Sequence, residues 1–351
     1  MSALSKGTSA AGAARGRRAW RLVGIFAAVA VVTAAAPFVG ASFISPWRLM
    51  TGALGEMDSA IFWQIRLPRV LLSFLAGAGL AVSGMAFQAL FRNPLATPFT
   101  LGVSSGASLG VAVYTVLGMA LAVPGLPGVS VAAFCGALLA IAIVYGLTRL
   151  KRGFSTATML LAGVALSFFF SSLILFVQYV ADLTHSFQII RWLMGSLDAV
   201  RYGSVLDVLP FVLGGSVIAV YLVHELNLLT TGEDIAASRG VNVSRTKKTV
   251  FLAVSLMVGG VVATCGPIGF VGMMVPHICR LMVGWEHRRL VPATLAFGGG
   301  FLVLCDAVSR VVIAPAEVPV GVVTALLGGP FFLWLLLGGG SEGGLLRGGR
   351  S

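Results

Sequence analysis

The side chains that could do chemistry in this sequence are few and far apart. None of the four histidines belongs to an HExxH motif or a Ser/His/Asp arrangement. His277 stands out in the run VPHICRL, but a lone histidine on an apolar helix is more often a packed, hydrogen-bonded side chain than a ligand. No two of the four cysteines form a Cys-x-x-Cys pair, so we expect them to pack as small apolar side chains. The sequence predicts no catalytic residue and no metal site.

The sequence also lacks a nucleotide site. A loop that cradles phosphates needs the pattern Gly-x-x-x-x-Gly-Lys-Ser/Thr, and neither Gly-Lys-Ser nor Gly-Lys-Thr occurs. No polar stretch is long enough for a nucleotide-binding domain. We therefore expect this chain to bind no cofactor. If ATP drives the protein, a partner subunit binds the ATP and its magnesium.

Ionisable residues inside apolar segments are the other place to look for chemistry. Ion-coupled transporters usually place carboxylates near the middle of the membrane. Here Glu225 lies near the inner end of one apolar segment, and Asp306 and Arg310 lie one helical turn apart near the outer end of another. These two fit an i,i+4 ion pair, and Arg310 also fits a binding role. No carboxylate is expected at mid-depth, which disfavours an ion-coupled secondary transporter but leaves that class open.

The composition explains why reactive side chains are scarce. Of the 351 residues, 58% are hydrophobic and 10% are charged, whereas soluble domains carry about 25% charged residues. So few charges cannot cover a water-facing surface, which excludes an ordinary soluble enzyme. The net charge of +12 comes mainly from short basic clusters between apolar runs. Lysine and arginine in such places set membrane topology, and no pattern favours a nucleic-acid partner.

We predict an all-α polytopic membrane protein with about ten transmembrane helices. The first apolar run, about 20–43, is too long for a signal peptide and long enough to cross a bilayer. Basic clusters near the span ends place both termini in the cytoplasm. Residues 1–19 are then a disordered cytoplasmic tail, 20–338 the transmembrane domain and 339–351 a second cytoplasmic tail. The nine later spans are expected at about 68–90, 98–122, 129–149, 156–180, 203–227, 247–266, 268–284, 290–312 and 319–338.

One span carries a stripe of small residues. Gly102, Gly106 and Gly110 recur every four positions, and such a stripe lets helix backbones approach closely in lipid. The interpretation we favour is packing within the chain, with a dimer seam or a conduit lining as alternatives.

The most informative loop lies on the basic, inner side, at residues 232–248. Glu233 and Asp234 begin a short helix, where acidic side chains suit the helix dipole, and Gly240 can end it. A second short turn then starts at Val241 and leads into the next span. Such a small-residue segment can pack into a groove on a cytosolic partner, although a plain connecting loop would have the same features.

Several segments together resemble one family. Residues 66–110, which begin RLPRVLLSFLAGAG and include the run FRNPLATPFTLGVSSGASLG, are similar to the second and third spans of FecCD-type ABC importer permeases. Residues 226–243, 265–281, 306–310 and 317–336 resemble later parts of the same family, in the same order. These permeases import iron–siderophore, haem and cobalamin.

The resemblance implies an ABC type II importer permease fold of ten helices in the bacterial inner (plasma) membrane. A homodimer would surround a central conduit, two copies of a cytosolic ABC ATPase would dock beneath it, and a periplasmic or extracellular binding protein would deliver the substrate. The chain itself would be no enzyme. Fe(III)-siderophore is the favoured cargo, with haem and cobalamin as alternatives and a membrane scaffold or receptor as a more distant one.

The same resemblance implies roles for three groups of residues. The loop at 232–246 matches the family's coupling helices, which contact the ATPase. The bases of RLPR and DAVSR match those that grip acidic residues of the binding protein, and our topology places them at a wet outer rim. Two other loops match those that narrow the inner mouth. The residues are Glu233, Ala236, Ala237, Gly240 and Val241 for coupling; Arg66, Arg69 and Arg310 for docking; and Asn93, Leu95, Ser155 and Thr156 for the cytoplasmic gate.

The resemblance also implies which elements line the passage. These are the span at 156–180, the short helix expected near 187–196 and the tenth span. Ala157 stands where the cobalamin importer has a polar residue, which mildly disfavours cobalamin as the cargo.

Overall fold

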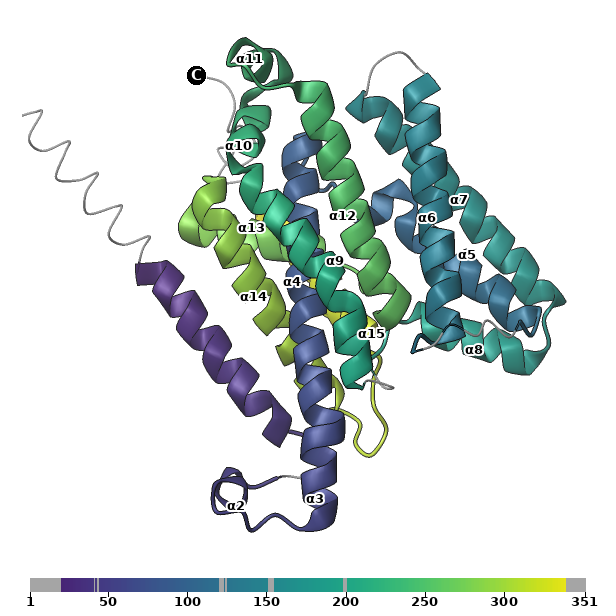
Figure 1. Ribbon diagram of the computed structural model, residues 1–351, viewed down its shortest axis with the longest axis vertical. Coiled ribbons are helices and arrows are strands. Elements are labelled where there is room, and N and C mark those ends of the chain that lie inside the picture. Colours follow the sequence, from purple (N-terminus) through teal and green to yellow (C-terminus); the bar gives the residue numbers. More distant parts are fainter. Residues whose placement is uncertain are drawn as a thin grey trace, which may run out of the picture.

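The computed structural model describes residues 20–40, 42, 44–119, 123, 125–150, 155–197 and 201–338. These residues are mostly helical, and the only strand pairing among them is an isolated bridge between Val123 and Leu126. Figure 1 shows the helices running roughly side by side along the long axis of the molecule. The two predicted tails, 1–19 and 339–351, lie outside the described residues, so their predicted positions stay predictions.

The prediction of ten membrane-spanning helices is confirmed for the described residues. Seven helical segments are long and apolar enough to cross a bilayer, and three shorter apolar helices complete the set. The long segments are Trp20–Phe38, Glu56–Phe91, Gly128–Leu150 (α6), Thr156–Val180 (α7), Tyr202–Tyr221 (α9), Val243–Cys265 (α12) and His287–Ser309 (α14). The shorter helices are Val103–Val116 (α5), Val271–Val283 (α13) and Val320–Gly338 (α15).

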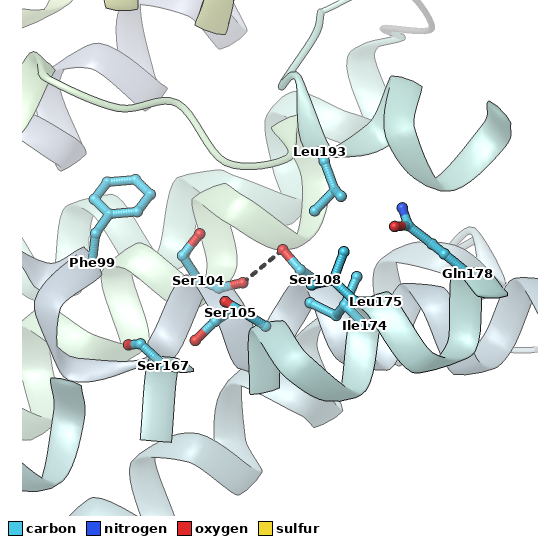
Figure 2. A pocket seen from close by; sticks show the side chains of 10 residues that line it. Phe99, Ser104, Ser105, Ser108, Ser167, Ile174, Leu175, Gln178 and Leu193 are labelled. Atoms are coloured by element: carbon cyan, nitrogen blue, oxygen red, sulfur yellow. Dashed lines mark hydrogen bonds between the residues drawn. The ribbon is translucent and has the colours of Figure 1, made fainter. Parts of the chain in front are cut away.

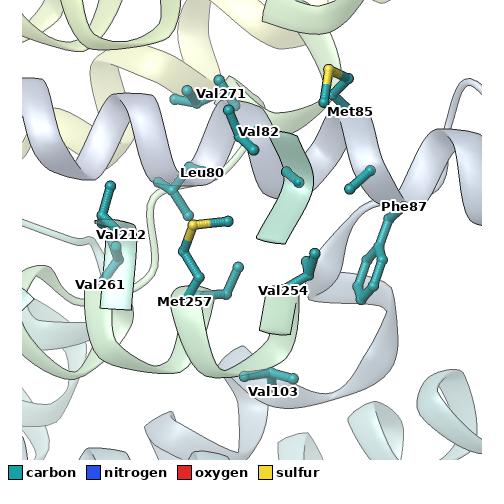
Figure 3. Close-up of a cluster of buried hydrophobic side chains, with 14 of the residues drawn as sticks. Leu80, Val82, Met85, Phe87, Val103, Val212, Val254, Met257, Val261 and Val271 are labelled. Carbon is teal, nitrogen blue, oxygen red and sulfur yellow. The ribbon is translucent and has the colours of Figure 1, made fainter. Parts of the chain in front are cut away.

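The second span is a continuous helical rod of three parts. It starts as α3 (Glu56–Ala60), widens into the π-helical turn η2 (Ile61–Arg66) and continues as α4 (Leu67–Phe91). Most of α4 is buried, and it contacts α9, α12, α13 and α14. Figure 3 shows its apolar side chains packed against those of α9, α12 and α13. The core of the molecule therefore surrounds α4. A helix that is apolar on all sides is typically buried at the centre of a bundle in this way.

Glycines permit the closest helix crossings. A Cβ atom at Gly84 of α4 would overlap the backbone of Gly272 in α13, and one at Gly77 would overlap Gly298 in α14. The stripe on α5 does the same against α6, because Gly106 faces the backbone of Gly136. Packing within the chain, the interpretation we favoured for this stripe, is therefore confirmed.

Two spans differ from the hydropathy prediction. The sixth span breaks at Leu222, where α9 ends and α10 (Val223–Thr231) turns away. The third span is shorter than 98–122: residues Pro98–Leu101 form the 3₁₀ turn η3, and Gly102 has φ +78°. Left-handed glycine conformations separate helices but leave the mean hydropathy unchanged, so hydropathy alone overlooks them. The seventh and eighth spans agree more closely with the prediction: α12 ends at Cys265, α13 begins at Val271, and Pro267 lies in the connection between them.

Several shorter helices lie at the ends of the bundle. The expected short helix near 187–196 is α8 (Leu183–Leu193), and Asp182 caps it by accepting a hydrogen bond from the backbone of His185. α8 contacts α5 and α7. The other short helices are η1 (Ala36–Phe38), α2 (Pro46–Met50) and α11 (Glu233–Ser238).

Candidate coupling, docking and gate sites

The inner loop between α10 and α12 folds into a compact projection, here called the coupling knuckle (residues 232–246). Gly232 has φ +137°, a conformation open to glycine, and it directs the chain from α10 into α11. Gly240 has φ +85° and ends α11, while the backbone N–H of Val241 donates back to the carbonyl of Ala236 at 3.0 Å. In Figure 1 the knuckle projects from one end of the bundle beside α10.

An ion pair fixes α11 against α12. The Lys247 ammonium lies 2.5 Å from the Glu233 carboxylate, and the lysine side chain is 4% exposed. Asn242 caps α12 by accepting a hydrogen bond from the backbone N–H of Arg245 at 3.0 Å. The second coupling helix that we predicted is therefore the first turn of α12 rather than a separate element.

The knuckle presents part of its surface outward. Ala237 and Gly240 are exposed, Val241 is half-buried, and no atom lies within 4 Å of a Cβ built on Gly240. Ala236 is 0% exposed, so our expectation that it contacts the ATPase needs correction. Ala236 lies on the face of α11 that packs against the neighbouring helices α10 and α12, so its methyl group is buried.

Charged side chains converge at the opposite end of α4. Arg69 donates to Asp306 at 2.8 Å and to Glu317 at 2.6 Å. Arg310 lies 3.3 Å from Asp306, which confirms the predicted i,i+4 pair. The Asp306 side chain is 0% exposed, whereas that of Glu317 is 38% exposed. We call Arg69, Asp306, Arg310 and Glu317 the outer charge cluster.

Two arginines bind the backbone that follows the first span. Arg310 donates to the carbonyls of Val39 at 2.9 Å and Ala36 at 3.2 Å. Arg66 donates to the carbonyls of Pro37 at 3.2 Å and Ser42 at 2.6 Å. These bonds supply donors to carbonyls around the end of the first span, although that of Ala36 also accepts from the backbone N–H of Val39 at 3.3 Å. The guanidinium groups thereby tie the first span to η2 and α14.

The expectation of a wet rim is wrong for these guanidinium groups. Arg66, Arg69 and Arg310 are 6%, 5% and 3% exposed. Burying a charge is costly unless partners surround it, and hydropathy could not reveal that carboxylates and carbonyls from distant segments would be those partners. Glu317 is the exposed member of the cluster. The docking role of the three arginines stays a prediction, and it now requires that a partner reach a buried group.

The gate residues lie in two turns at the same end of the bundle as the knuckle (Figure 1). Asn93 and Leu95 follow α4 and are exposed, and the Asn93 side chain accepts a hydrogen bond from the backbone of Leu95 at 2.9 Å. Ser155 precedes α7 and is exposed, and Thr156 is half-buried. Residues 151–154 between them and α6 lie outside the described part of the chain. No ion pair or hydrogen bond between the two turns is present among the described residues.

The histidine and cysteines singled out in the sequence pack without forming a reactive cluster among the described residues. His277 packs edge-on against Phe331, with ring centroids 6.0 Å apart. Three cysteines are buried and Cys135 is exposed, and all four are free thiols. Within the described ranges, no three His, Cys, Asp or Glu side chains gather where they could hold a metal ion.

One polar site escaped the sequence analysis. A pocket of about 440 Å³ opens between α5, α7 and α8 (Figure 2), and we call it the serine pocket. The available signal was the concentration of serine in two otherwise apolar spans, in the runs SSGAS and SFFFSS. Its lining residues are Phe99, Ser104, Ser105, Ser108, Ser167, Ser171, Ile174, Leu175, Gln178 and Leu193.

Comparison with known proteins decides the family. Residues 27–338 match the model of the FecCD transport family. The chain belongs to this family. It is 43% identical over 295 residues to the uncharacterized ABC transporter permease protein YvrB of Bacillus subtilis, a match that covers 82% of each chain.

Named relatives include permeases for different cargoes. The chain is 39% identical to the hemin transport system permease protein HmuU of Yersinia pestis, over 84% of this chain and 88% of HmuU. It is also 39% identical to the cobalamin import system permease protein BtuC of Halobacterium salinarum, over 90% and 85% of the two chains. A solved transporter assigned to the metal-chelate ABC type, in an inward-facing conformation, superposes with a TM-score of 0.81 at 31% identity and covers 90% of this chain and 98% of its own.

The fold and the family together establish the coarse identity of the molecule. This FecCD-family chain is an all-α ABC importer permease with the type II fold, and it is a multi-pass protein of the bacterial inner membrane. Its relatives are transporter subunits. The identities to the haem and cobalamin permeases are equal, so they do not separate those two cargoes.

Proposed function

We propose that this permease imports Fe(III)-siderophore complexes, with ATP bound and hydrolysed on a separate ATPase. The observation that carries the cargo assignment is the superposition on a transporter of the metal-chelate type along nearly the whole of both chains. Haem and cobalamin remain the alternative cargoes, because named relatives carry them.

The coupling knuckle is the proposed docking point for two copies of the ATPase. Its exposed small residues, Ala237 and Gly240, leave room for a partner to approach the backbone. The half-buried ion pair between Glu233 and Lys247 would make α11 move with α12. A push on the knuckle would therefore be transmitted along a span that is 23 residues long. Alternating access would follow as a population shift between outward-open and inward-open states.

The passage is proposed to form between two copies of this chain. α7 is poorly covered within the single chain: its side chains at Phe168, Leu175 and Tyr179 are 72%, 67% and 88% exposed. α15 likewise exposes Leu326 and Trp334. A lipid-facing helix would look similar, but the resemblance assigns these two helices to the passage wall. A soluble binding protein would deliver the cargo at the end that carries the outer charge cluster.

Competition between cargoes tests the assignment. The permease is reconstituted in vesicles with an ATPase and a binding protein that assemble with it, and uptake of iron-55 bound to a siderophore is measured with unlabelled haem or cobalamin as competitors. We expect ATP-dependent uptake of the ferric chelate that a second ferric chelate suppresses and the other two do not. Uptake of haem or cobalamin alone would contradict the siderophore assignment.

A further inference from the structure

We propose that the serine pocket contacts the cargo during passage and favours neutral chelates rich in oxygen and amide groups over anionic ones. The proposal rests on the proposed function, because α7 and α8 line the passage only if the chain is an importer permease. It goes beyond that function by naming a site and a class of chelate. The pocket volume of about 440 Å³ lies within the range of roughly 300–1,000 Å³ that is usual for small-molecule sites.

The pocket wall presents hydrogen-bonding groups in an apolar setting. Figure 2 shows the serines of α5 lying between Phe99 at one end and Gln178 at the other. The hydroxyls of Ser105, Ser108 and Ser167 donate to backbone carbonyls of the preceding helical turn at 3.1, 2.9 and 2.8 Å. Their protons are thus used within the chain, and their oxygen lone pairs remain available as acceptors.

Ser104 differs from its neighbours. It is 6% exposed, it lines the pocket, and its hydroxyl has no hydrogen-bond partner among the described residues. The side-chain amide of Gln178 is half-buried and has no partner there either. Both groups line the pocket and are not engaged by another described side chain or backbone group, so they are free to bond to a ligand that enters it. Both side chains can donate as well as accept, which suits hydroxyl, amide and hydroxamate groups.

The chemistry of the lining also disfavours some ligands. None of the ten residues that line the pocket is ionisable, and none is a histidine, cysteine, methionine or tyrosine. A trianionic chelate, or the carboxylates of haem, would lose water there without meeting a cation. Haem iron would find no axial ligand in the wall. A neutral ferric tris-hydroxamate avoids both penalties.

A cysteine reporter tests occupancy directly. Ser171 lines the pocket from α7 and is exposed, so Ser171→Cys is labelled with a neutral maleimide in a Cys135→Ala background, on the permease–ATPase complex in lipid nanodiscs. The matched control is Ser172→Cys, an exposed neighbour that does not line the pocket. The probes are a neutral ferric tris-hydroxamate, a trianionic ferric tris-catecholate and haem.

The expected result is selective protection. At twice its dissociation constant, the neutral hydroxamate should slow labelling of Ser171→Cys about threefold and leave Ser172→Cys unchanged. Equal protection by haem or by the catecholate would overturn the selectivity. Absence of protection by the hydroxamate would overturn the site. If the same complex still imports a chelate, the proposed function survives that failure, whereas an ATP-driven complex that imports none contradicts the function itself.

A conservative variant separates binding from folding. Ser104→Ala removes a hydroxyl that bonds to no described residue, so the thermal melting temperature of the complex should not fall. Protection by the hydroxamate should then require about two- to tenfold more chelate, as expected for one lost hydrogen bond, while Ser172→Ala behaves as wild type. Unchanged protection in Ser104→Ala would contradict the proposed role of this hydroxyl.

Discussion

At the residue scale, the structure assigns different roles to charges that look alike in the sequence. Asp306 is fully buried between Arg69 and Arg310, whereas Glu317 reaches the surface and shares only Arg69. A buried carboxylate that neutralises two buried bases cannot be removed cheaply, because the bases are left without compensation. A partly exposed pair contributes much less, since water screens it.

This difference predicts unequal stability effects. Asp306→Asn should destabilise the purified permease by about 3–5 kcal/mol, the usual cost of breaking a buried pair, while Glu317→Gln should cost less than about 1 kcal/mol. Thermal unfolding in one detergent measures both variants against wild type. Similar melting temperatures for the two variants would show that the outer charge cluster is not organised around Asp306.

The outer cluster also bears on docking. Arg69 is already paired with Glu317, so an acidic group of the binding protein would have to replace that carboxylate. Glu317→Gln should therefore tighten docking of the binding protein, and the charge reversal Arg69→Glu should weaken it, as followed by surface plasmon resonance with the permease in nanodiscs. Assembly with the ATPase at the far end serves as the control for both. Docking that is indifferent to both changes would refute the role of Arg69.

At the element scale, hydropathy predicted the membrane spans, because each depends on a long apolar run. It overlooked breaks between helices, because each depends on the backbone conformation of a single residue. The ten spans follow from long continuous apolar runs, which cross lipid as helices because a helix satisfies its own backbone hydrogen bonds. The break at Leu222 and the turn at Gly102 do not follow from such runs. The candidate sites were recognised from the family resemblance, but neither the burial of Arg66 nor the partner of Lys247 could be inferred, because each depends on residues far away in the sequence.

Helix crossings provide a test at this scale. Gly84→Ala should lower stability by about 1–3 kcal/mol, because its methyl group overlaps the backbone of α13 and the helices must separate. Gly146→Ala in α6 is the matched control, since open space surrounds that position, and it should be neutral or slightly stabilising. Equal melting temperatures for the two variants would contradict the close crossing of α4 and α13.

The coupling knuckle is tested by bulk on its exposed face. Ala237→Trp should reduce co-purification of the ATPase at least about tenfold, because a large side chain there costs more than about 1.4 kcal/mol of contact. Met57→Trp, an exposed position at the other end of the molecule, controls for general effects of tryptophan and should assemble normally. Normal assembly of Ala237→Trp would remove this face from the ATPase interface.

At the scale of the whole molecule, the described residues form a bundle with one charged end, one projecting knuckle and a poorly covered side at α7 and α15. The buried side chains of Arg69, Asp306 and Lys247 are paired within the chain, whereas several buried hydroxyls, such as those of Ser83, Ser216 and Ser255, have no hydrogen-bond partner among the described residues. We expect a partner ATPase to supply the motion that drives transport, and the coupling knuckle is the proposed point of contact.

The most direct test of this account is uptake of the ferric chelate by vesicles that contain the permease and binding protein with an active ATPase, with an ATPase that binds but does not hydrolyse ATP, or with none. The account predicts accumulation only with the active ATPase, and no effect of collapsing the ion gradients. Undiminished accumulation without the ATPase, abolished when the gradients collapse, would contradict it.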